Sequence, residues 1–243
     1  MASTNVTSKP LAGMTALVTG ASRGIGLAIA RRLAGLGSPI SLCARDAARL
    51  NSAAAQLRGE GADVLAIVAD VTHADEIQTL VDRTQRELGP VEILVNNAGI
   101  GKFGPAHQLT EADWDAVLDT NLKSVFLVTR AVAPGMIERR RGYIVNISSL
   151  AGKNAFANGG IYCASKWGLM GLTGCMAEDL RAHNIRVSAI CPGSVATDFS
   201  PHTGRDTSKL LQPDDVAHAV ATLVTQAPQS FISEIDLRPT QKP

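Results

Sequence analysis

An apolar segment from Met14 to Thr19 runs directly into a glycine-rich turn and then into a helical pattern from Leu27 to Leu36. The turn carries Gly20, Gly24 and Gly26 in the spacing GxxxGxG. A strand, a glycine turn and a helix in this order present unpaired backbone N–H groups and the positive end of the helix dipole, where a pyrophosphate can lie. We expect Gly20 to make the tight turn, Gly24 to allow close approach to phosphate, and Gly26 to let the helix pack on the strand.

Further short apolar runs alternate with helical stretches along the rest of the chain. These runs are 40–44, 64–69, 93–95, 143–147, 187–190 and 231–237. Such alternation predicts a parallel sheet with helices on both faces. A chain of 243 residues without a linker can bury this core as one unit. We therefore predict an α/β fold, a single-domain Rossmann-type doubly wound sheet over residues 13–237, with a flexible N-terminal tail (1–12) and a C-terminal tail (238–243).

The glycine turn also fits a second motif. Gly20, Ser22 and Gly24 satisfy GxSxG, the nucleophile elbow of the α/β-hydrolases. That elbow needs an earlier strand and loop to supply an oxyanion donor, and only thirteen mostly polar residues precede Met14. Position in the chain therefore argues against a hydrolase.

The middle of the chain has the spacing of a proton-donating site. Tyr162 follows Ser149 by thirteen residues and precedes Lys166 by four. Apolar recurrence predicts a helix from Tyr162 to about His183, which places Lys166 on the face of Tyr162. A neighbouring ammonium favours the phenolate, so we expect Lys166 to lower the tyrosine pKa from about 10 and to make Tyr162 an acid and base. A half-buried helix with an exposed lysine is the alternative interpretation of this short pattern.

Several motifs in one order resemble the short-chain dehydrogenase/reductase family. They are TGASRGIG, NNAG at 96–99, Asn121, Ser149, Tyr162, Lys166 and PGSVAT at 192–197. The resemblance covers about residues 12 to 237. It implies a catalytic set in which Ser149 hydrogen-bonds the substrate oxygen, Tyr162 donates the proton, and Lys166 tunes Tyr162 and binds the nicotinamide ribose. By the same resemblance the backbone of Asn121, in a local helix kink, holds a water that links Lys166 to solvent. The spacing to the tyrosine selects Ser149 over Ser148.

The resemblance also implies a dinucleotide site. Asp70 matches the family position that bonds the adenine amino group, Val71 supplies a backbone N–H, and the PGSVAT segment holds the carboxamide. The expected cofactor-binding residues are Gly20, Ser22, Arg23, Gly24, Ile25, Gly26, Arg45, Asp70, Val71, Asn97, Ala98, Gly99, Tyr162, Lys166, Pro192, Gly193, Val195 and Thr197.

The end of the second predicted strand indicates which dinucleotide is bound. Enzymes that prefer NAD carry an Asp or Glu there, and this chain has Ala44. Arg45 follows at once and Arg23 lies in the glycine turn, so two guanidinium groups can hold a 2′-phosphate. We therefore predict NADP(H), with ordinary surface arginines as the alternative.

The substrate is less constrained. Ile100, Phe103, Leu150, Phe156, Ile161 and Phe199 lie beside the motifs and form either an apolar pocket or core. Residues 198–212 match the family's substrate lid, and their polar sequence predicts a short, open cover.

Two substrate classes stay open. β-Ketoacyl-acyl-carrier-protein reductases use basic residues near the pocket mouth to dock the acidic carrier, and the chain has Arg140 at one such position but His183 at the other. Its ending, SEIDLRPTQKP, looks more like relatives that act on small hydroxy acids or diverse carbonyls. We predict a 3-oxoacyl-[acyl-carrier-protein]-like reductase with acyl carrier protein as a partner, and a general carbonyl or small 3-hydroxy acid dehydrogenase as the alternative. A non-catalytic NADP(H)-binding sensor is the alternative from another class.

Composition excludes several other functions. A net charge of +1 gives no general reason to bind nucleic acid or an anionic membrane. The N-terminus lacks the apolar core of a signal peptide and no apolar run can span a bilayer, which predicts a cytoplasmic protein. Cys43, Cys163, Cys175 and Cys191 have no CxxC spacing, so we expect them to be small core residues, and we predict no metal.

Two helical segments predict the assembly. Residues 121–140 and 162–183 carry apolar side chains over much of their circumference. The resemblance implies that subunits pair through these helices, which predicts a homotetramer, with a dimer as the alternative.

Overall fold

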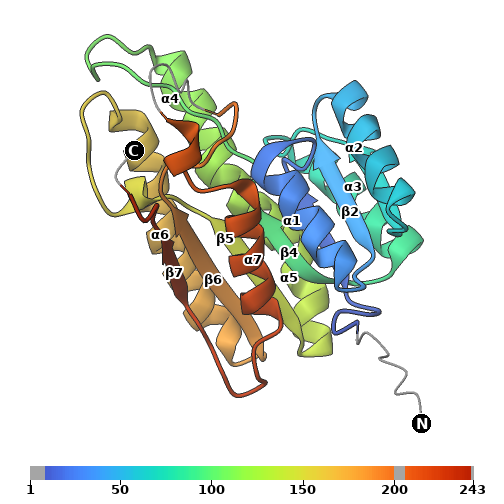
Figure 1. Ribbon diagram of the computed structural model, residues 1–243. Helices are drawn as coiled ribbons and strands as arrows, with labels where there is room; N and C mark the ends of the chain where they lie inside the picture. The colour runs from blue at the N-terminus through green and yellow to red at the C-terminus, as the bar shows by residue number, and fades with distance from the viewer. Residues whose placement is uncertain (1–8, 200–205, 242–243) are drawn as a thin grey trace.

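The computed structural model describes residues 9–199 and 206–241, and in this part of the chain seven strands form one parallel sheet in the order β3-β2-β1-β4-β5-β6-β7 (Figure 1). The strands are β1 (Thr15–Thr19), β2 (Ile40–Ala44), β3 (Val64–Val68), β4 (Val91–Asn96), β5 (Gly142–Ile147), β6 (Ile185–Pro192) and β7 (Glu234–Leu237). The predicted fold class is therefore confirmed.

Helices cover both faces of the sheet. They are α1 (Gly24–Gly35), α2 (Ala47–Gly59), α3 (Ala74–Leu88), α4 (Glu111–Leu118), α5 (Ser124–Arg139), α6 (Gly160–Arg181) and α7 (Pro213–Val224). One core cluster joins α1, α2 and α7 to the sheet, and a second joins α3, α5 and α6 to its other face. Figure 1 shows α1 and α7 side by side on the near face.

Strand burial follows position in the sheet. Every residue of β1 and β4 is buried, whereas β7, at the edge, is half exposed. We predicted its strand from Phe231, but β7 begins at Glu234 and Phe231 is exposed. Burial on both faces explains why the central runs are continuously apolar and were simple to find.

The strand order reverses between β1 and β4, so the connections leave these two strands toward opposite edges of the sheet. In doubly wound sheets the crevice at the carboxyl ends of such strands is where ligands bind. This topology places the β1–α1 glycine turn and the NNAG segment at the same crevice.

The structure also bears on the expected burial of the cysteines and on the expected absence of a membrane-spanning segment. Cys43, Cys163 and Cys191 are buried, but Cys175 is exposed, because it lies on the outward face of α6, so its assignment to the core was wrong. Among the described residues, no helix is both long enough and apolar enough to cross a membrane. The cytoplasmic location stays a prediction.

Candidate active site

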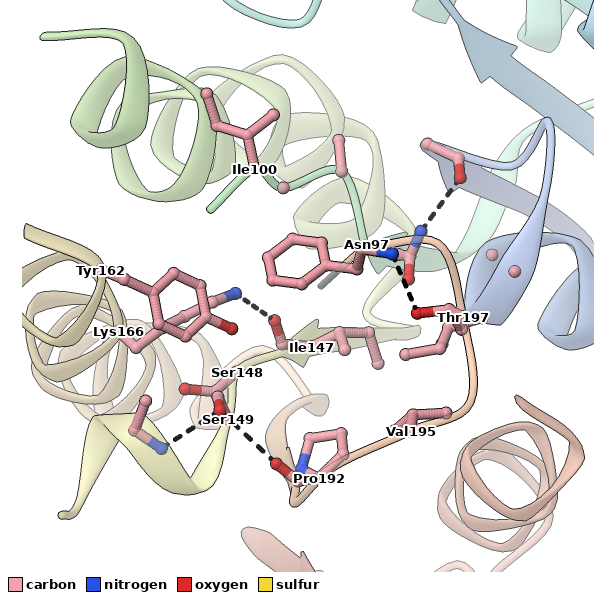
Figure 2. Close-up of a pocket in the computed structure, with 18 of the residues that line it drawn as sticks. Asn97, Ile100, Ile147, Ser148, Ser149, Tyr162, Lys166, Pro192, Val195 and Thr197 are labelled. Atoms are coloured by element: carbon pink, nitrogen blue, oxygen red, sulfur yellow. Dashed lines mark hydrogen bonds between the residues drawn. The ribbon is translucent and has the colours of Figure 1, made fainter. Parts of the chain in front are cut away.

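A cleft of about 1820 Å³ lies at the carboxyl ends of the strands. It is lined by all eighteen residues expected to bind the cofactor and by Ser149. Figure 2 shows Tyr162, Lys166, Ser148 and Ser149 together on one side, and Asn97, Val195 and Thr197 on the other. Segments far apart in the sequence therefore meet in one site.

The glycine turn needs its glycines for both conformation and space. Gly20 and Gly24 have φ of +64° and +56°, a left-handed backbone that favours glycine. A Cβ on Gly20 would lie 2.8 Å from the Ala98 Cα, and one on Gly26 would lie 2.5 Å from the Gly20 carbonyl oxygen. The turn is thus packed directly against the NNAG segment, and the left-handed Gly20 fits the tight turn that we expected.

The start of helix α1 fits an anion. The residue at its N-cap, Arg23, makes no side-chain cap hydrogen bond, and the first turn of α1 carries no acidic residue. The amides of that turn and the positive end of the helix dipole face the cleft, where a pyrophosphate would satisfy them. The residues present therefore fit a dinucleotide.

Asn97 fixes the two central strand ends to each other. Its side-chain Nδ2 donates to the Thr19 carbonyl at 2.9 Å and to the Gly20 carbonyl at 3.1 Å. In return the Thr19 hydroxyl accepts from the backbone N–H groups of Asn97 and Ala98, at 3.0 and 3.1 Å. These bonds hold the floor of the cleft in one shape.

The two arginines expected at the 2′-phosphate lie at the rim and already have acidic partners. Arg45 Nη1 lies 3.6 Å from Asp70 Oδ2, and Arg23 Nη1 lies 2.9 Å from Asp198 Oδ2. Burial raises the pKa of Asp70, but hydrogen bonds from Thr72 and the charge of Arg45 outweigh it and the pKa is lowered overall.

A third arginine was missed from the sequence. Arg49, four residues beyond Arg45, lines the same part of the cleft and pairs with Asp46 at 3.3 Å. Arg49 lies in the first turn of α2, directly after the loop that carries Arg45, and its short distance along the sequence from Arg45 was the available signal.

The proton-donating group is assembled at the start of α6. Lys166 is buried, and its ammonium lies 5.8 Å from the centre of the Tyr162 ring, so the two side chains do share a face. The ammonium donates to the Ile147 carbonyl at 2.9 Å (Figure 2). The Ser149 hydroxyl accepts from the Ala151 N–H at 3.1 Å, which holds the serine at the start of a short 3₁₀ turn, Leu150–Gly152.

The expected effect of Lys166 on Tyr162 was wrong. Burial raises the pKa of Tyr162 to about 12, although a hydrogen bond with Ser149 acts in the opposite direction. Burial also lowers the pKa of Lys166 to about 8. Withdrawal from water therefore dominates both pKa shifts, because the charged forms lose hydration.

Ser148 and Ser149 have different surroundings. The Ser148 hydroxyl is buried and finds no hydrogen-bond partner within residues 9–199 and 206–241, whereas the Ser149 hydroxyl donates to the Pro192 carbonyl oxygen at 3.5 Å. Both serines line the cleft. Ser149 is the one tied by hydrogen bonds and in contact with Tyr162.

Asn121 is near the cleft but not in its lining. It lies in a π-helical turn, Asp119–Lys123, between α4 and α5, which is the local kink that we expected. Its side chain is buried and bonds both backbone groups of Ile100 at 2.8 and 2.9 Å, as well as the Ser165 hydroxyl at 3.0 Å. Asn121 therefore ties the NNAG loop to α6.

The candidate substrate pocket is partly as predicted. Ile100, Phe103, Leu150, Phe156 and Phe199 line the cleft, while Ile161 is buried outside the lining and belongs to the core. Of the predicted lid, 198–212, residues 200–205 lie outside the described residues. Arg238, Pro239 and Gln241, which we assigned to the C-terminal tail, also line the cleft.

The two positions considered for carrier docking lie far from the cleft within one subunit. His183 follows the last turn of α6 and Tyr162 lies in its first, so the 22-residue helix separates them by roughly 30 Å. Arg140 ends α5 beside His183, and its guanidinium donates to the Ala182 carbonyl at 2.9 Å. Within a single subunit the two residues therefore do not lie at the pocket mouth, and carrier docking stays a prediction.

One group of possible metal ligands exists among the described residues. A thiol and two carboxylates, from Cys191, Glu234 and Asp236, lie within 4.8 Å of one another. The Lys153 ammonium pairs with both carboxylates, 2.7 Å from Asp236 Oδ1, and supplies the positive charge there. The absence of a metal stays a prediction.

A crevice at a topological switch point, with a glycine turn at one end and a tyrosine–lysine pair at the other, defines the class of dinucleotide-dependent oxidoreductases. The family model described as short chain dehydrogenase matches residues 14–208. The chain belongs to the short-chain dehydrogenase/reductase family of oxidoreductases, as the motifs predicted, and not to the hydrolases.

Similar proteins differ in what they act on. Gluconate 5-dehydrogenase from Gluconobacter oxydans is 41% identical over 190 residues, which is 78% of this chain and 74% of that protein. The 3-oxoacyl-[acyl-carrier-protein] reductase of Synechocystis is 34% identical over 231 residues, 92% of this chain and 94% of that one. A crystal structure of a metagenomic short-chain oxidoreductase in complex with NADP is 46% identical, covers 96% of this chain and 100% of its own, and has a TM-score of 0.86.

Proposed function

We propose that this protein reduces a carbonyl group to an alcohol with NADPH. The observation that carries the proposal is the convergence of Ser149, Tyr162 and Lys166 in the same cleft as the glycine turn. When bound, NADPH supplies the hydride. The protein contributes position, hydrogen bonds and a proton.

Each polar group has a task in this proposal. The hydroxyls of Ser149 and Tyr162 hydrogen-bond the carbonyl oxygen, and these bonds strengthen as negative charge develops on it. A tyrosine with a pKa of about 12 is fully protonated at neutral pH, so Tyr162 holds the proton that the oxygen receives. The nearby Lys166 ammonium then stabilises the phenolate. We assign the backbone of Asn121, in its π-helical turn, to the water that returns a proton to this pair.

The rim arginines support NADP(H) over NAD(H). Position 44 is an alanine, and Arg23 and Arg45 both line the cleft. Both guanidinium groups are more than half exposed, so a 2′-phosphate can compete with the acidic partners, exposed Asp198 and partly buried Asp70. The similar metagenomic oxidoreductase was crystallised with NADP.

A 3-oxoacyl thioester is the first substrate class in this proposal, supported by the similarity to the Synechocystis reductase. A general carbonyl or small hydroxy acid substrate is the second candidate. Within one subunit Arg140 and His183 lie far from the cleft, which supports the second candidate, because neither can dock an acidic carrier at its own subunit's mouth.

NADPH absorbance, followed with purified protein, tests the proposal. The panel contains a β-ketoacyl thioester, a small β-keto ester, a diketone and an aromatic aldehyde, and each hit is repeated with NADH. We expect Tyr162→Phe to lose about 10²–10⁴-fold in kcat while it still binds NADPH. Tight NADPH binding with no turnover across the panel would favour the sensor.

We also propose a homotetramer built through α5 and α6. Both helices carry a large exposed apolar side chain, Phe126 at 45% and Trp167 at 53% exposure. Exposed groups of this size on adjoining helices are typical of subunit contacts. Sedimentation as a monomer at micromolar concentration would contradict this assembly.

A further inference from the structure

Three phenylalanines cluster at the Tyr162 ring, two in contact with it and the third in contact with one of these two. Each comes from a loop that follows a different strand. Phe103 follows β4, Phe156 follows β5 and Phe199 follows β6. The Tyr162 ring centre lies 5.5 Å from that of Phe103 and 5.7 Å from that of Phe199, and Phe103 lies 6.3 Å from Phe156. These four rings form a continuous aromatic cluster at the proton donor.

We propose that Phe103, Phe156 and Phe199 bind an aryl group next to the reacting carbonyl, so that aryl ketones and aryl aldehydes are the preferred substrates. The inference rests on the proposed carbonyl reduction and adds the substrate class. We call these three rings the phenyl wall.

The phenyl wall exposes apolar surface inside the cleft. Phe103 is 41% exposed, Phe156 49% and Phe199 42%, and all three line the cleft beside Tyr162. Half-exposed aromatic side chains that gather around one polar group are typical of a binding site. An apolar group that covers them is favoured in proportion to the area it removes from water.

Glycines hold the rings in place from behind. A Cβ on Gly101 would lie 2.6 Å from Cε2 of Phe103 and 3.2 Å from Cε1 of Phe199. A Cβ on Gly159 would lie 2.5 Å from Cζ of Phe156. Each ring therefore packs directly on glycine backbone, where a side chain would displace it.

The angles between the rings favour a further aromatic partner. Phe103 meets Tyr162 edge to face at 61°, and Tyr162 meets Phe199 at 53°. Tilted and edge-to-face pairs of this kind contribute beyond buried area, through the ring quadrupole. A flat aryl substituent can continue this arrangement, whereas a puckered saturated ring of the same carbon count cannot.

Two polar side chains near the phenyl wall already have protein partners. The Asn154 amide donates to the Leu150 carbonyl at 3.1 Å, and Lys102 pairs with Asp113 at 3.1 Å. A hydroxyl group that packs against the phenyl rings would lose its bonds to water, because the rings offer no conventional donor or acceptor in return.

A matched pair of ketones tests the inference. Acetophenone and cyclohexyl methyl ketone have the same number of carbons but differ in having a flat or a puckered ring. We expect Phe103→Leu and Phe199→Leu each to lower the ratio of kcat/KM for acetophenone over cyclohexyl methyl ketone by about threefold to tenfold. Phe156→Leu should lower it less, because among the ring contacts described it meets Phe103 and not Tyr162.

Phe231→Leu is the control. Phe231 is 41% exposed, as Phe103 is, but it does not line the cleft. In this variant the ratio of kcat/KM for acetophenone over cyclohexyl methyl ketone should stay within about twofold of the parent value, since no ring contact to a substrate is lost. Melting temperatures of all four variants show whether a change in ratio accompanies loss of the fold.

Two outcomes would overturn the inference. Unchanged ratios in Phe103→Leu and Phe199→Leu, with both ketones still reduced, would reject the phenyl wall and leave the proposed carbonyl reduction intact. If neither ketone is reduced, ligand-observed NMR with the same two ketones measures binding to the parent and Phe199→Leu. Equal binding of both ketones to the parent would then also reject the phenyl wall as an aryl-binding site. Preferential binding of acetophenone that is lost in Phe199→Leu would support it.

Discussion

The two halves of the cleft are built in different ways. On the cofactor side, backbone approaches backbone, with Gly20 against Ala98, and the Asn97 amide joins the ends of β1 and β4. On the substrate side, the surface is made by the side chains of loops, above all Phe103 and Phe199, which are about two-fifths exposed.

The difference indicates how each half responds to substitution. A surface made by close-packed backbone tolerates almost no added atom, so changes there should affect the fold and cofactor binding together. A surface made by half-exposed side chains can change shape without cost to the core, so changes there should affect selectivity alone. The predictions below test this contrast.

Gly26→Ala should have the largest effect. The new Cβ would lie 2.5 Å from the Gly20 carbonyl and from the Asn97 Nδ2, neither of which can move without opening the turn. We expect a loss of about 1–3 kcal/mol in the free energy of unfolding and at least a tenfold weaker NADPH affinity. Denaturant unfolding and NADPH titration measure the two quantities.

Gly35→Ala is the matched control on the same helix. A Cβ on Gly35 meets nothing within 4 Å, so alanine should stabilise α1 by up to about 1 kcal/mol and leave NADPH affinity unchanged. A Gly26→Ala protein with parental stability and affinity would remove the contrast between the two halves.

The second prediction concerns the cofactor rim. Ala44→Asp together with Arg45→Ala should lower kcat/KM with NADPH by about 10- to 100-fold, because a charge-assisted bond to phosphate is lost and a like charge is added. Efficiency with NADH should rise, since an aspartate there can bond the ribose 2′-OH. Arg31→Ala, an exposed arginine of α1 paired with Glu60 outside the cleft, is the control. An unchanged ratio of kcat/KM with NADPH to kcat/KM with NADH would reject the assignment of this rim to the 2′-phosphate.

The third prediction is a pH profile. The Lys166 ammonium is present below its pKa of about 8, and the Tyr162 proton is present up to about pH 12. As pH rises through 8, Lys166 loses its charge and the phenolate loses its stabiliser, so kcat/KM for reduction should fall by up to tenfold per pH unit. A profile that stays flat to pH 10 would show that the ammonium does not assist Tyr162.

The same contrast explains what could be predicted from sequence. Fold class and the glycine turn were readable because continuous apolar strands and glycine spacing reflect short-range geometry. The position of Lys166 beside Tyr162 followed from helical periodicity, but their pKa values did not, because burial depends on how the sheet, α6 and the phenyl rings pack together.

The cleft-lining residues that follow the last strand, β7, were also missed. Arg238 and Pro239 line the cleft because β7 brings the chain back beside Gly193, whose N–H donates to the Leu237 carbonyl at 2.8 Å. Nothing local in SEIDLRPTQKP indicates this, since it depends on which strand β7 joins. The place of Arg140 was missed for a related reason, since only the packing of α5 shows that Arg140 lies beside Ala182, at the far end of α6 from Tyr162.

The smallest effect should come from an ion pair that joins the two halves of the cleft. Arg23, in the glycine turn, pairs with Asp198, which precedes Phe199 of the phenyl wall. Both side chains are more than half exposed, so Asp198→Asn should change the free energy of unfolding by less than about 1 kcal/mol. Because the pair competes with a 2′-phosphate for Arg23, the variant should bind NADPH up to about fivefold more tightly and NADH unchanged, with the gain lost at high salt. Titration of both dinucleotides at two salt concentrations measures this, and weaker NADPH binding would show that Asp198 orients Arg23 for the phosphate instead of competing for it.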